Sequence, residues 1–327
     1  MRSLRFISLS LIIMVAVVGL LLDFSRQYYY LHILTLCYIY AIASSGWDIC
    51  YGYAGLLNLG ASAFWGMGAY FVAFQYLWFG ITPWIGIFTA ALISAAIGTG
   101  IGALTTKTKG LYFALATLAF PNVLLPIFTW RYEITGGSYG LTIPWTGENA
   151  FAMQFKSPTY YYFISLAFLV LMCFVKERFS MSKYGYYLRA IGADEVAASS
   201  IGINSFRIRL IGIAFSSFML GIAGGIYFCF LRYVDPYEAF GWNITIQFVL
   251  ATILGGVGTI IGPIVGILIF TPFSEIVKLY LERAWGSRFI GMHFVIYGAT
   301  LMCIILLMPK GVYPKMKKYF MDKWCLK

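Results

Sequence analysis

The strongest constraint on the fold is a series of apolar segments that recurs along the whole chain. Each is roughly 17–25 residues long, the length that an α-helix needs to cross a lipid bilayer. The chain is 61% hydrophobic and only 11% charged, whereas a soluble domain is roughly a quarter charged, so we expect an integral membrane protein. The apolar segments occupy residues 6–22, 31–50, 55–79, 84–106, 110–130, 158–176, 208–231, 241–258, 262–281 and 290–308.

These segments predict an all-α fold, a polytopic membrane bundle of about ten transmembrane helices in one domain, residues 1–327. Because glycine and proline divide 31–79 and 241–281, about eight helices plus re-entrant segments fit equally well. When the segments alternate from a cytoplasmic N-terminus, most of the 23 lysines and arginines fall on the cytoplasmic side. Positively charged loops remain inside, so both termini are predicted to be cytoplasmic.

The net charge of +11 is explained by this topology, because the basic residues lie between apolar runs and do not form a nucleic-acid-binding patch. The basic tail, residues 309–327, is interpreted as an anchor on membrane lipid. The outer segment 131–157 is rich in glycine and proline and is expected to form an ordered turn at most.

Metal and catalytic sites are not expected. The six cysteines form no C-x-x-C pair, and the two histidines, His32 and His293, stand far apart. A metal site needs three or four converging ligands, and an enzyme needs a cluster of titratable groups at one place. We therefore predict no metal, no bound cofactor and no enzymatic activity.

The longest polar interruption forms a basic loop, residues 177–209. Within it, Asp194 is suited to cap a short helix over 195–201, and Gly202 is suited to end that helix. Asn204 or Ser205 would then cap the next membrane helix. A short surface helix of this kind would present itself to a soluble partner, and the alternative is a solvated loop between two membrane helices.

Two glycine-rich stretches, 52–70 and 254–266, have the pattern of interrupted membrane helices. Unwound backbone survives in a membrane only where it lines protein or a cavity, so these stretches indicate a solute path. Ordinary turns between short helices are the alternative, as are interhelical hydrogen bonds for each polar side chain. The scarcity of acidic residues at depth argues against proton coupling and favours an uncharged or zwitterionic solute. The tentative path residues are Asn58, Gly60, Thr117, Asn122, Asn243, Gln247, Gly255 and Gly256.

Small residues also recur four apart, as in Gly98 with Gly102, Gly221 with Gly225, and Gly262 with Gly266. This spacing allows two helix backbones to approach closely, and we expect it to serve helix packing within the bundle.

Several motifs together resemble one family, the inner-membrane permeases of branched-chain amino acid ABC importers, and the LivM-type subunit more than the LivH-type. The motifs occur in order over about residues 50–312, and together they are specific to the family. Two departures are Gly192 and Ala193, where the family often has Arg–Glu, and Pro121, which interrupts a run that the family usually continues. The motifs are GYAGLLNLGASAFWGMGAY (52–70), KGLYFALATLAF (109–120), TGGSYGL (135–141), YGYYLRAIGADEVAASSIGINSFRIRL (184–210), LGGVGTIIGPIVG (254–266) and PKGV (309–312).

The resemblance implies a multi-pass protein of the bacterial inner membrane that moves branched-chain amino acids or a similar small solute. Urea or short amides are alternatives within the family, and an ion-coupled transporter or channel is the alternative outside it. The implied partners are a cytoplasmic ABC ATPase dimer that uses the ATP, a homologous LivH-type permease, and a periplasmic or lipid-anchored solute-binding protein. The sequence itself has no phosphate-binding loop of the form GxxxxGK[ST]. The residues implied to contact the ATPase are Tyr184, Gly185, Leu188, Arg189, Ile191, Asp194, Glu195, Ala198, Ile201 and Gly202.

Overall fold

The structure is a computed structural model that describes residues 19–20, 23–24, 26–106, 108, 110–285, 298–299, 302 and 311–316, with the backbone alone for 278–285. Most of the segments predicted at 6–22 and 290–308, and most of the tail 309–327, lie outside this description.

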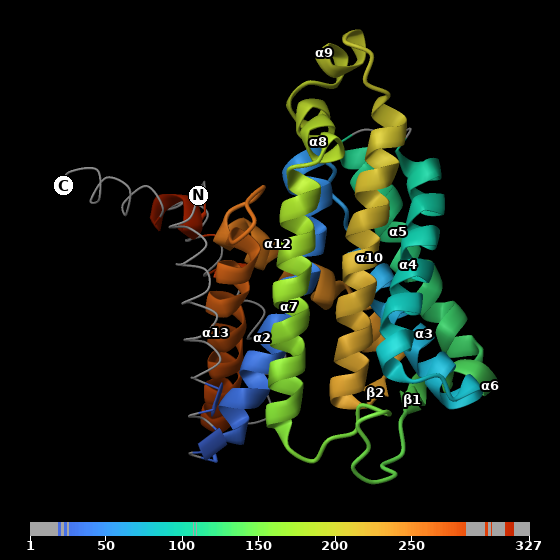
Figure 1. The fold of residues 1–327 in the computed structure, drawn as a ribbon, viewed down its shortest axis with the longest axis vertical. Helices are drawn as coiled ribbons and strands as arrows, with labels where there is room; N and C mark the ends of the chain where they lie inside the picture. The colour runs from blue at the N-terminus through green and yellow to red at the C-terminus, as the bar shows by residue number, and fades with distance from the viewer. Residues whose placement is uncertain are drawn as a thin grey trace, which may run out of the picture.

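Long helices dominate the described part of the chain, which confirms the all-α prediction (Figure 1). Five of them are long and apolar enough to cross a membrane, at 28–53, 83–105, 111–130, 158–180 and 205–231. The total of about ten and the location of the termini remain predictions. The long helices are α2 (Tyr28–Asp48), continued by the π-helix η1 (Ile49–Tyr53), α3 (Ala61–Phe79), α4 (Pro83–Thr105), α5 (Leu111–Trp130), α7 (Pro158–Ser180), α10 (Ser205–Leu231), α12 (Trp242–Gly255) and α13 (Gly262–Trp285).

Short elements lie at the two ends of the bundle. One end carries the loop 177–209, and we call it the loop end; the other carries a small β-ribbon, and we call it the ribbon end (Figure 1). The loop end has α8 (Lys183–Ala193) and α9 (Glu195–Ser200); the ribbon end has α6 (Tyr132–Thr135), the 3-10 helix η2 (Gly137–Tyr139), β1 (Leu141–Thr142), β2 (Tyr233–Val234) and α11 (Pro236–Ala239).

Helix ends follow the sequence closely. The Thr82 hydroxyl accepts a hydrogen bond from the Trp84 amide, and Pro83 occupies the first turn of α4, where its missing N–H is not needed. Gly80 ends α3 in the left-handed conformation, with φ of +63°. Pro121, in contrast, does not interrupt α5, which remains helical from Leu111 to Trp130.

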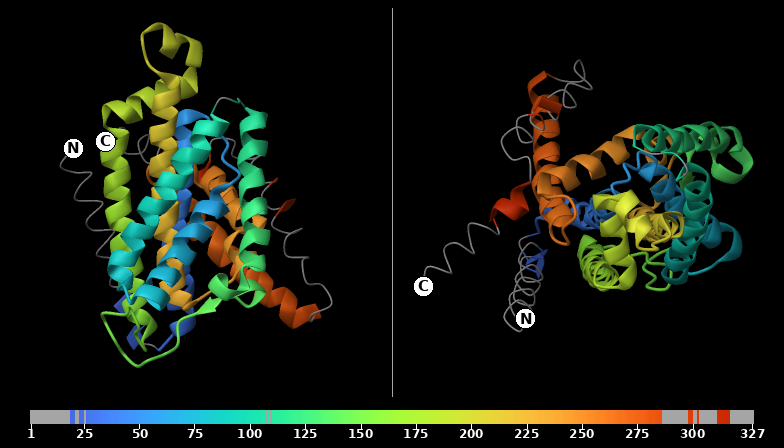
Figure 2. Two further views of the ribbon diagram at one scale, coloured as in Figure 1. Left: turned by 90° about the vertical axis from the view of Figure 1, so that its right-hand side faces the viewer. Right: turned by 90° about the horizontal axis from the view of Figure 1, so that it is seen from above.

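The centre of the bundle is formed by α2 and α10. Helix α2 is almost wholly buried and α10 is mostly buried, whereas α4, α5 and α7 are largely exposed. Seen from the loop end, α13 lies at one edge of the bundle, and α4 and α5 lie at the opposite edge (Figure 2). The exposed apolar faces are therefore those available to lipid or to another membrane subunit.

Glycine allows the helices to cross closely, as the four-residue spacing predicts. A Cβ atom on Gly221 of α10 would lie 2.9 Å from the Ala91 Cα of α4, and one on Gly102 of α4 would lie 2.9 Å from the Ile213 side chain. Such contacts supply the dispersion energy that holds helices together in a membrane, where the hydrophobic effect between them is weak.

The segment 131–157 is more ordered than the single turn expected of it. It contains α6, η2 and β1, and β1 pairs antiparallel with β2, so that Leu141 is opposite Val234. The Gln154 side chain accepts hydrogen bonds from the Thr146 amide (3.0 Å) and hydroxyl (3.1 Å). The pairing of β1 with β2 ties the segment to the end of α10. Local glycine and proline content could not predict this pairing, because the two strands are far apart in the sequence.

Candidate functional site

The loop 177–209 folds into two helices. The Asp194 carboxylate accepts hydrogen bonds from the Val196 and Ala197 amides at 2.8 and 3.0 Å, which confirms the predicted cap of α9. Gly202 ends this segment with φ of +87°. Asn204 caps α10 by accepting from the Arg207 amide at 3.0 Å. The sequence interpretation missed the larger helix α8, although Ser182 as a cap, with Leu188 and Ile191 three residues apart, was a usable signal.

Helix α8 is packed tightly on the bundle. Leu188 lies against Gly212 of α10, and Gly185 lies against the carbonyl groups at the end of α7. Gly192 lies so close to the Tyr53 carbonyl that any Cβ atom there would overlap it. The departure from the family pattern at Gly192 therefore coincides with a close backbone approach.

Charged groups add to this attachment. Arg189 donates a hydrogen bond to the Ser180 hydroxyl, and its guanidinium carbon lies 4.5 Å from the centre of the Tyr53 ring. On the other side of the loop, Arg209 of α10 forms an ion pair of 2.9 Å with Glu195 of α9. Helix α8 is thus attached to η1, which contains Tyr53, as well as to α7 and α10.

The outer surface of the loop carries several exposed apolar side chains among its polar ones. Val196 and Ile201 are each 76% exposed. Exposed apolar side chains on a projecting tip are typical of a docking surface for another protein. The other exposed apolar side chains there, which the sequence interpretation did not single out except within the motif, are Met181, Tyr186, Tyr187 and Phe206.

The residues assigned to this loop from sequence thus divide into two groups. The buried ones attach the loop to the bundle, and the others lie wholly or partly at its surface. The buried ones are Gly185, Leu188, Ile191 and Ala198; the others are Tyr184, Arg189, Asp194, Glu195, Ile201 and Gly202.

The first interrupted segment, residues 55–60, separates η1 from α3 and has no helical structure. The Asn58 carbonyl accepts a hydrogen bond from the Trp47 indole at 2.7 Å, and the Asn58 side chain accepts from the Gly60 amide at 2.9 Å. The Leu59 amide donates to the Thr117 hydroxyl at 3.1 Å. Two of the backbone groups that unwinding frees are therefore bonded to α2 and α5, and a third is bonded within the segment, as a membrane interior requires.

Helix α5 has a matching irregularity where this segment crosses it. Pro121 has no N–H, so the Thr117 carbonyl loses its partner within the helix. Gly60 lies directly against that carbonyl, with no room for a Cβ atom. The structure thus brings together three predicted path residues, Asn58, Gly60 and Thr117, and adds Trp47 as a partner that the sequence did not indicate.

The second interrupted segment, residues 256–261, joins α12 to α13. Gly256 and Gly258 adopt positive φ values of +125° and +74°. The Thr259 hydroxyl donates to the Gly256 carbonyl at 2.8 Å and accepts from the Gly262 amide at 2.9 Å. The stretch 254–266 is therefore a tight turn between two helices that pack on each other.

A buried ion pair lies against this turn. The Lys176 ammonium of α7 is 2.9 Å from the Asp48 carboxylate of α2, and both side chains are 0% exposed. The Gly258 amide donates to the other Asp48 oxygen at 2.7 Å, and Lys176 also donates to the Thr259 carbonyl at 3.2 Å. Lys176 stands at the edge of the predicted apolar segment 158–176, and its side chain is wholly buried in this ion pair.

The remaining predicted path residues do not join the first cluster. Asn122 is exposed on the outer side of α5 and donates to the Leu118 carbonyl at 2.9 Å. Asn243 is exposed near the start of α12, Gln247 is half-buried, and Gly255 lies at the second interrupted segment. Gly256 lies in that same segment.

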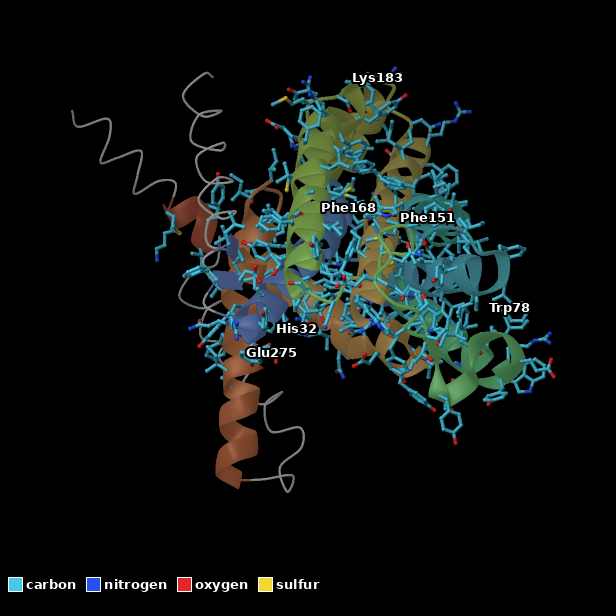
Figure 3. The ribbon with its side chains drawn as sticks, turned by 60° about the horizontal axis from the view of Figure 1, so that its bottom comes forward. His32, Trp78, Phe151, Phe168, Lys183 and Glu275 are labelled. Carbon is cyan, nitrogen blue, oxygen red and sulfur yellow. The ribbon has the colours of Figure 1, made fainter. Side chains whose placement is uncertain are left out.

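Acidic groups at depth are few among the described residues. Glu275 of α13 lies near His32 of α2, toward the ribbon end, whereas Lys183 marks the far end of the molecule (Figure 3). Within the described ranges there is no group of three or more histidine, cysteine, aspartate or glutamate residues that could hold a metal ion.

Comparison with known proteins places these features in a family. The family model described as the branched-chain amino acid transport system permease component matches residues 29–305. The chain is 28% identical to the high-affinity branched-chain amino acid transport system permease protein LivM of Salmonella typhimurium, over 86% of this chain and 69% of that protein. It is 25% identical to the probable LivM of Methanocaldococcus jannaschii, over 87% and 95% of the two chains. It is 26% identical to LivH of Salmonella typhimurium, over 85% and 92%. No solved structure gives a significant match.

Proposed function

Because this chain belongs to the family of branched-chain amino acid transport permease components, we propose that it is the LivM-like, membrane-spanning subunit of an ABC importer. It lies in the bacterial inner membrane and moves branched-chain amino acids or a similar small zwitterionic solute. It uses no ATP itself, and a separate ATPase dimer supplies the energy.

The observation that carries this proposal is the shape of the loop end. Helix α9 projects beyond the membrane-length helices (Figure 1), and Val196 and Ile201 are exposed there, with no part of the described chain covering them. Exposing several apolar side chains to water at the end of the loop costs free energy unless a partner covers them. The loop is therefore suited to sit in a cleft of a cytoplasmic protein. The basic loop also lies on the side that the positive-inside rule assigns to the cytoplasm.

Movement of the docked loop is supported by the contacts of α8. Arg189 and Gly192 of α8 both contact Tyr53, the last residue of η1. The first interrupted segment, residues 55–60, begins two positions after Tyr53. When the ATPase dimer closes, α8 would push on η1 and so on the first interrupted segment. The solute path would then change between outward-open and inward-open forms.

The remaining partners fit the other surfaces. The largely exposed face of α5 carries one amide, Asn122, among apolar side chains, which suits the face that a second, LivH-type permease would complete. The ordered ribbon end, with β1 and β2, suits contact with a solute-binding protein.

The solute class is supported by the chemistry around the first interrupted segment. Its polar groups are uncharged: the Asn58 amide, the Thr117 hydroxyl, and the backbone of residues 58–60. Uncharged dipoles of this kind suit a zwitterion or a neutral amide better than an ion. Urea and short amides are therefore the second candidate substrates, and competition by leucine, isoleucine, valine and urea in an uptake assay distinguishes them.

The test is purification of the full chain in detergent from its native membrane, with its associated proteins identified. We expect an ABC ATPase and a second permease to copurify. In proteoliposomes containing that complex and the binding protein, uptake should require ATP inside. Solute accumulation by this chain alone, driven by an ion gradient, would show that it is a secondary transporter and would overturn the proposal.

A further inference from the structure

The buried pair formed by Asp48 and Lys176 lies between η1 and the second interrupted segment, near the loop end of the bundle. We propose that this pair joins α8, η1 and the turn 256–261 into one body, so that the turn moves whenever the ATPase moves α8. The inference rests on the proposed function, because the ATPase is the source of the movement.

The first step is the connection from α8 to the pair. Arg189 of α8 bonds to Ser180 at the end of α7, one turn beyond Lys176. Arg189 and Lys176 also approach the same ring, that of Tyr53, with charge-to-centre distances of 4.5 and 5.9 Å. Tyr53 is buried, and it therefore transmits a displacement of α8 directly to the end of α7.

The second step is the connection from the pair to the turn. Each ion has one bond to its partner and one to the turn: Asp48 accepts from the Gly258 amide, and Lys176 donates to the Thr259 carbonyl. A Cβ atom on Gly52 of η1 would overlap both the Asp48 carboxylate and the Gly258 backbone. Helix η1 therefore cannot move toward the turn without displacing it, and the bonds of the ion pair resist its movement away.

The third step is energetic. Neither ion is accessible to water, so separating the elements would leave a bare charge in a low-dielectric interior. A buried ion pair is a poor source of stability, because apolar residues of similar size often replace it without loss. The pair nevertheless constrains the positions of α2, α7 and the turn relative to one another. Each ion needs both its partner and its backbone group on the turn, so the four groups must stay together.

The first experiment replaces both ions by apolar side chains of similar size, Asp48→Leu with Lys176→Met, in the complete complex. The apolar pair can fill the space but cannot bond to the turn. We expect the ATPase to remain bound and its unstimulated activity to be kept, while stimulation by the loaded binding protein and transport fall about tenfold or more. Transport within about twofold of the unchanged protein would show that the pair is only structural and would overturn the inference.

A second measurement keeps the ion pair intact, so it does not depend on the folding of that variant. Spin labels at Lys183→Cys on α8, Val257→Cys on the turn and Leu104→Cys on α4 report three distances in the complex. On trapping with a non-hydrolysable ATP analogue, the 183–257 distance should stay constant while both distances to 104 change. A changed 183–257 distance would overturn the inference alone. Failure of any ATPase to copurify would overturn the proposed function, and this inference with it.

Discussion

The two interrupted segments are held in different ways. Residues 55–60 are held by uncharged groups, the Trp47 indole and the Thr117 hydroxyl, which lie on two different helices. Residues 256–261 are held by the ions Asp48 and Lys176, which have no access to water. Neutral hydrogen bonds can be exchanged for bonds to a solute at small cost, whereas a buried charge cannot leave its partner. The first segment is thus suited to contact solute, and the second is suited to transmit force.

Removing one ion of the buried pair should have the largest effect of these variants, and the effect is on the stability of the protein. Lys176→Met leaves the Asp48 carboxylate buried without its counter-ion, so we expect a loss of about 3–5 kcal/mol in the free energy of unfolding. Thermal unfolding in detergent measures this change. Lys183→Met, at an exposed lysine, is the matched control and should leave the transition unchanged. A transition for Lys176→Met that equals the control would mean that the pair is not buried as described.

The second-largest effect is expected on binding of the ATPase, and it tests whether the ATPase docks at the loop end. The substitutions Val196→Asp and Ile201→Asp each introduce a negative charge, and each should weaken binding of the ATPase about tenfold to a hundredfold. The reason is that these two apolar side chains would be buried at the centre of the interface with the ATPase. Stability should change little, since both side chains are exposed in the free chain. Titration of the purified ATPase measures the affinity. Thr142→Asp, an exposed position at the ribbon end, carries the same charge and should bind normally.

A smaller effect is expected at the first interrupted segment. Thr117→Val removes the hydroxyl that accepts from the Leu59 amide, which leaves a half-buried donor unpaired at a cost of about 1 kcal/mol. If this segment contacts solute, transport in proteoliposomes should show an altered KM as well as reduced stability. Thr117→Ser keeps the hydroxyl and should restore both. Lost stability with an unchanged KM would place the solute elsewhere.

The smallest effect concerns the cap of α9. Asp194→Ala removes the acceptor for two amides and should cost about 1 kcal/mol of helix stability. Membrane insertion should be retained, while stimulation of the ATPase falls. Asp194→Asn keeps a capping oxygen and should behave like the unchanged protein. Equal stimulation in all three proteins would exclude α9 from the coupling contact.

Local features of the fold were predictable because local sequence determines them. Proline and glycine mark the ends of α4 and α3, and Asp194 marks the start of α9. Helix α8 was missed because its segment lies in the longest polar interruption of the chain, although its cap and its buried residues are local signals. The single apolar segment predicted at 110–130 is found as α5, which remains helical through Pro121 despite one missing hydrogen bond.

The site was predictable only in part, because its essential contacts are distant in sequence. Asp48 and Lys176 are 128 positions apart, and no periodicity in a single chain links them. Asn58 and Thr117 could be chosen as polar residues in apolar segments, but their meeting depends on how α3 and α5 cross. The same criterion selected Asn122, which lies on the opposite side of its helix.

The burial of α2 has a consequence for how the protein is made. Its membrane segment has a mean hydropathy of 1.4, the lowest among the five candidate spans, which otherwise reach 1.8 or 1.9. Much of its cover comes from α10, which begins at Ser205. A ribosome must therefore synthesise most of the polypeptide before α2 acquires its final neighbours. Chains truncated before α10 should expose α2 to membrane proteases, so that quality control removes them before they can join an unfinished transporter.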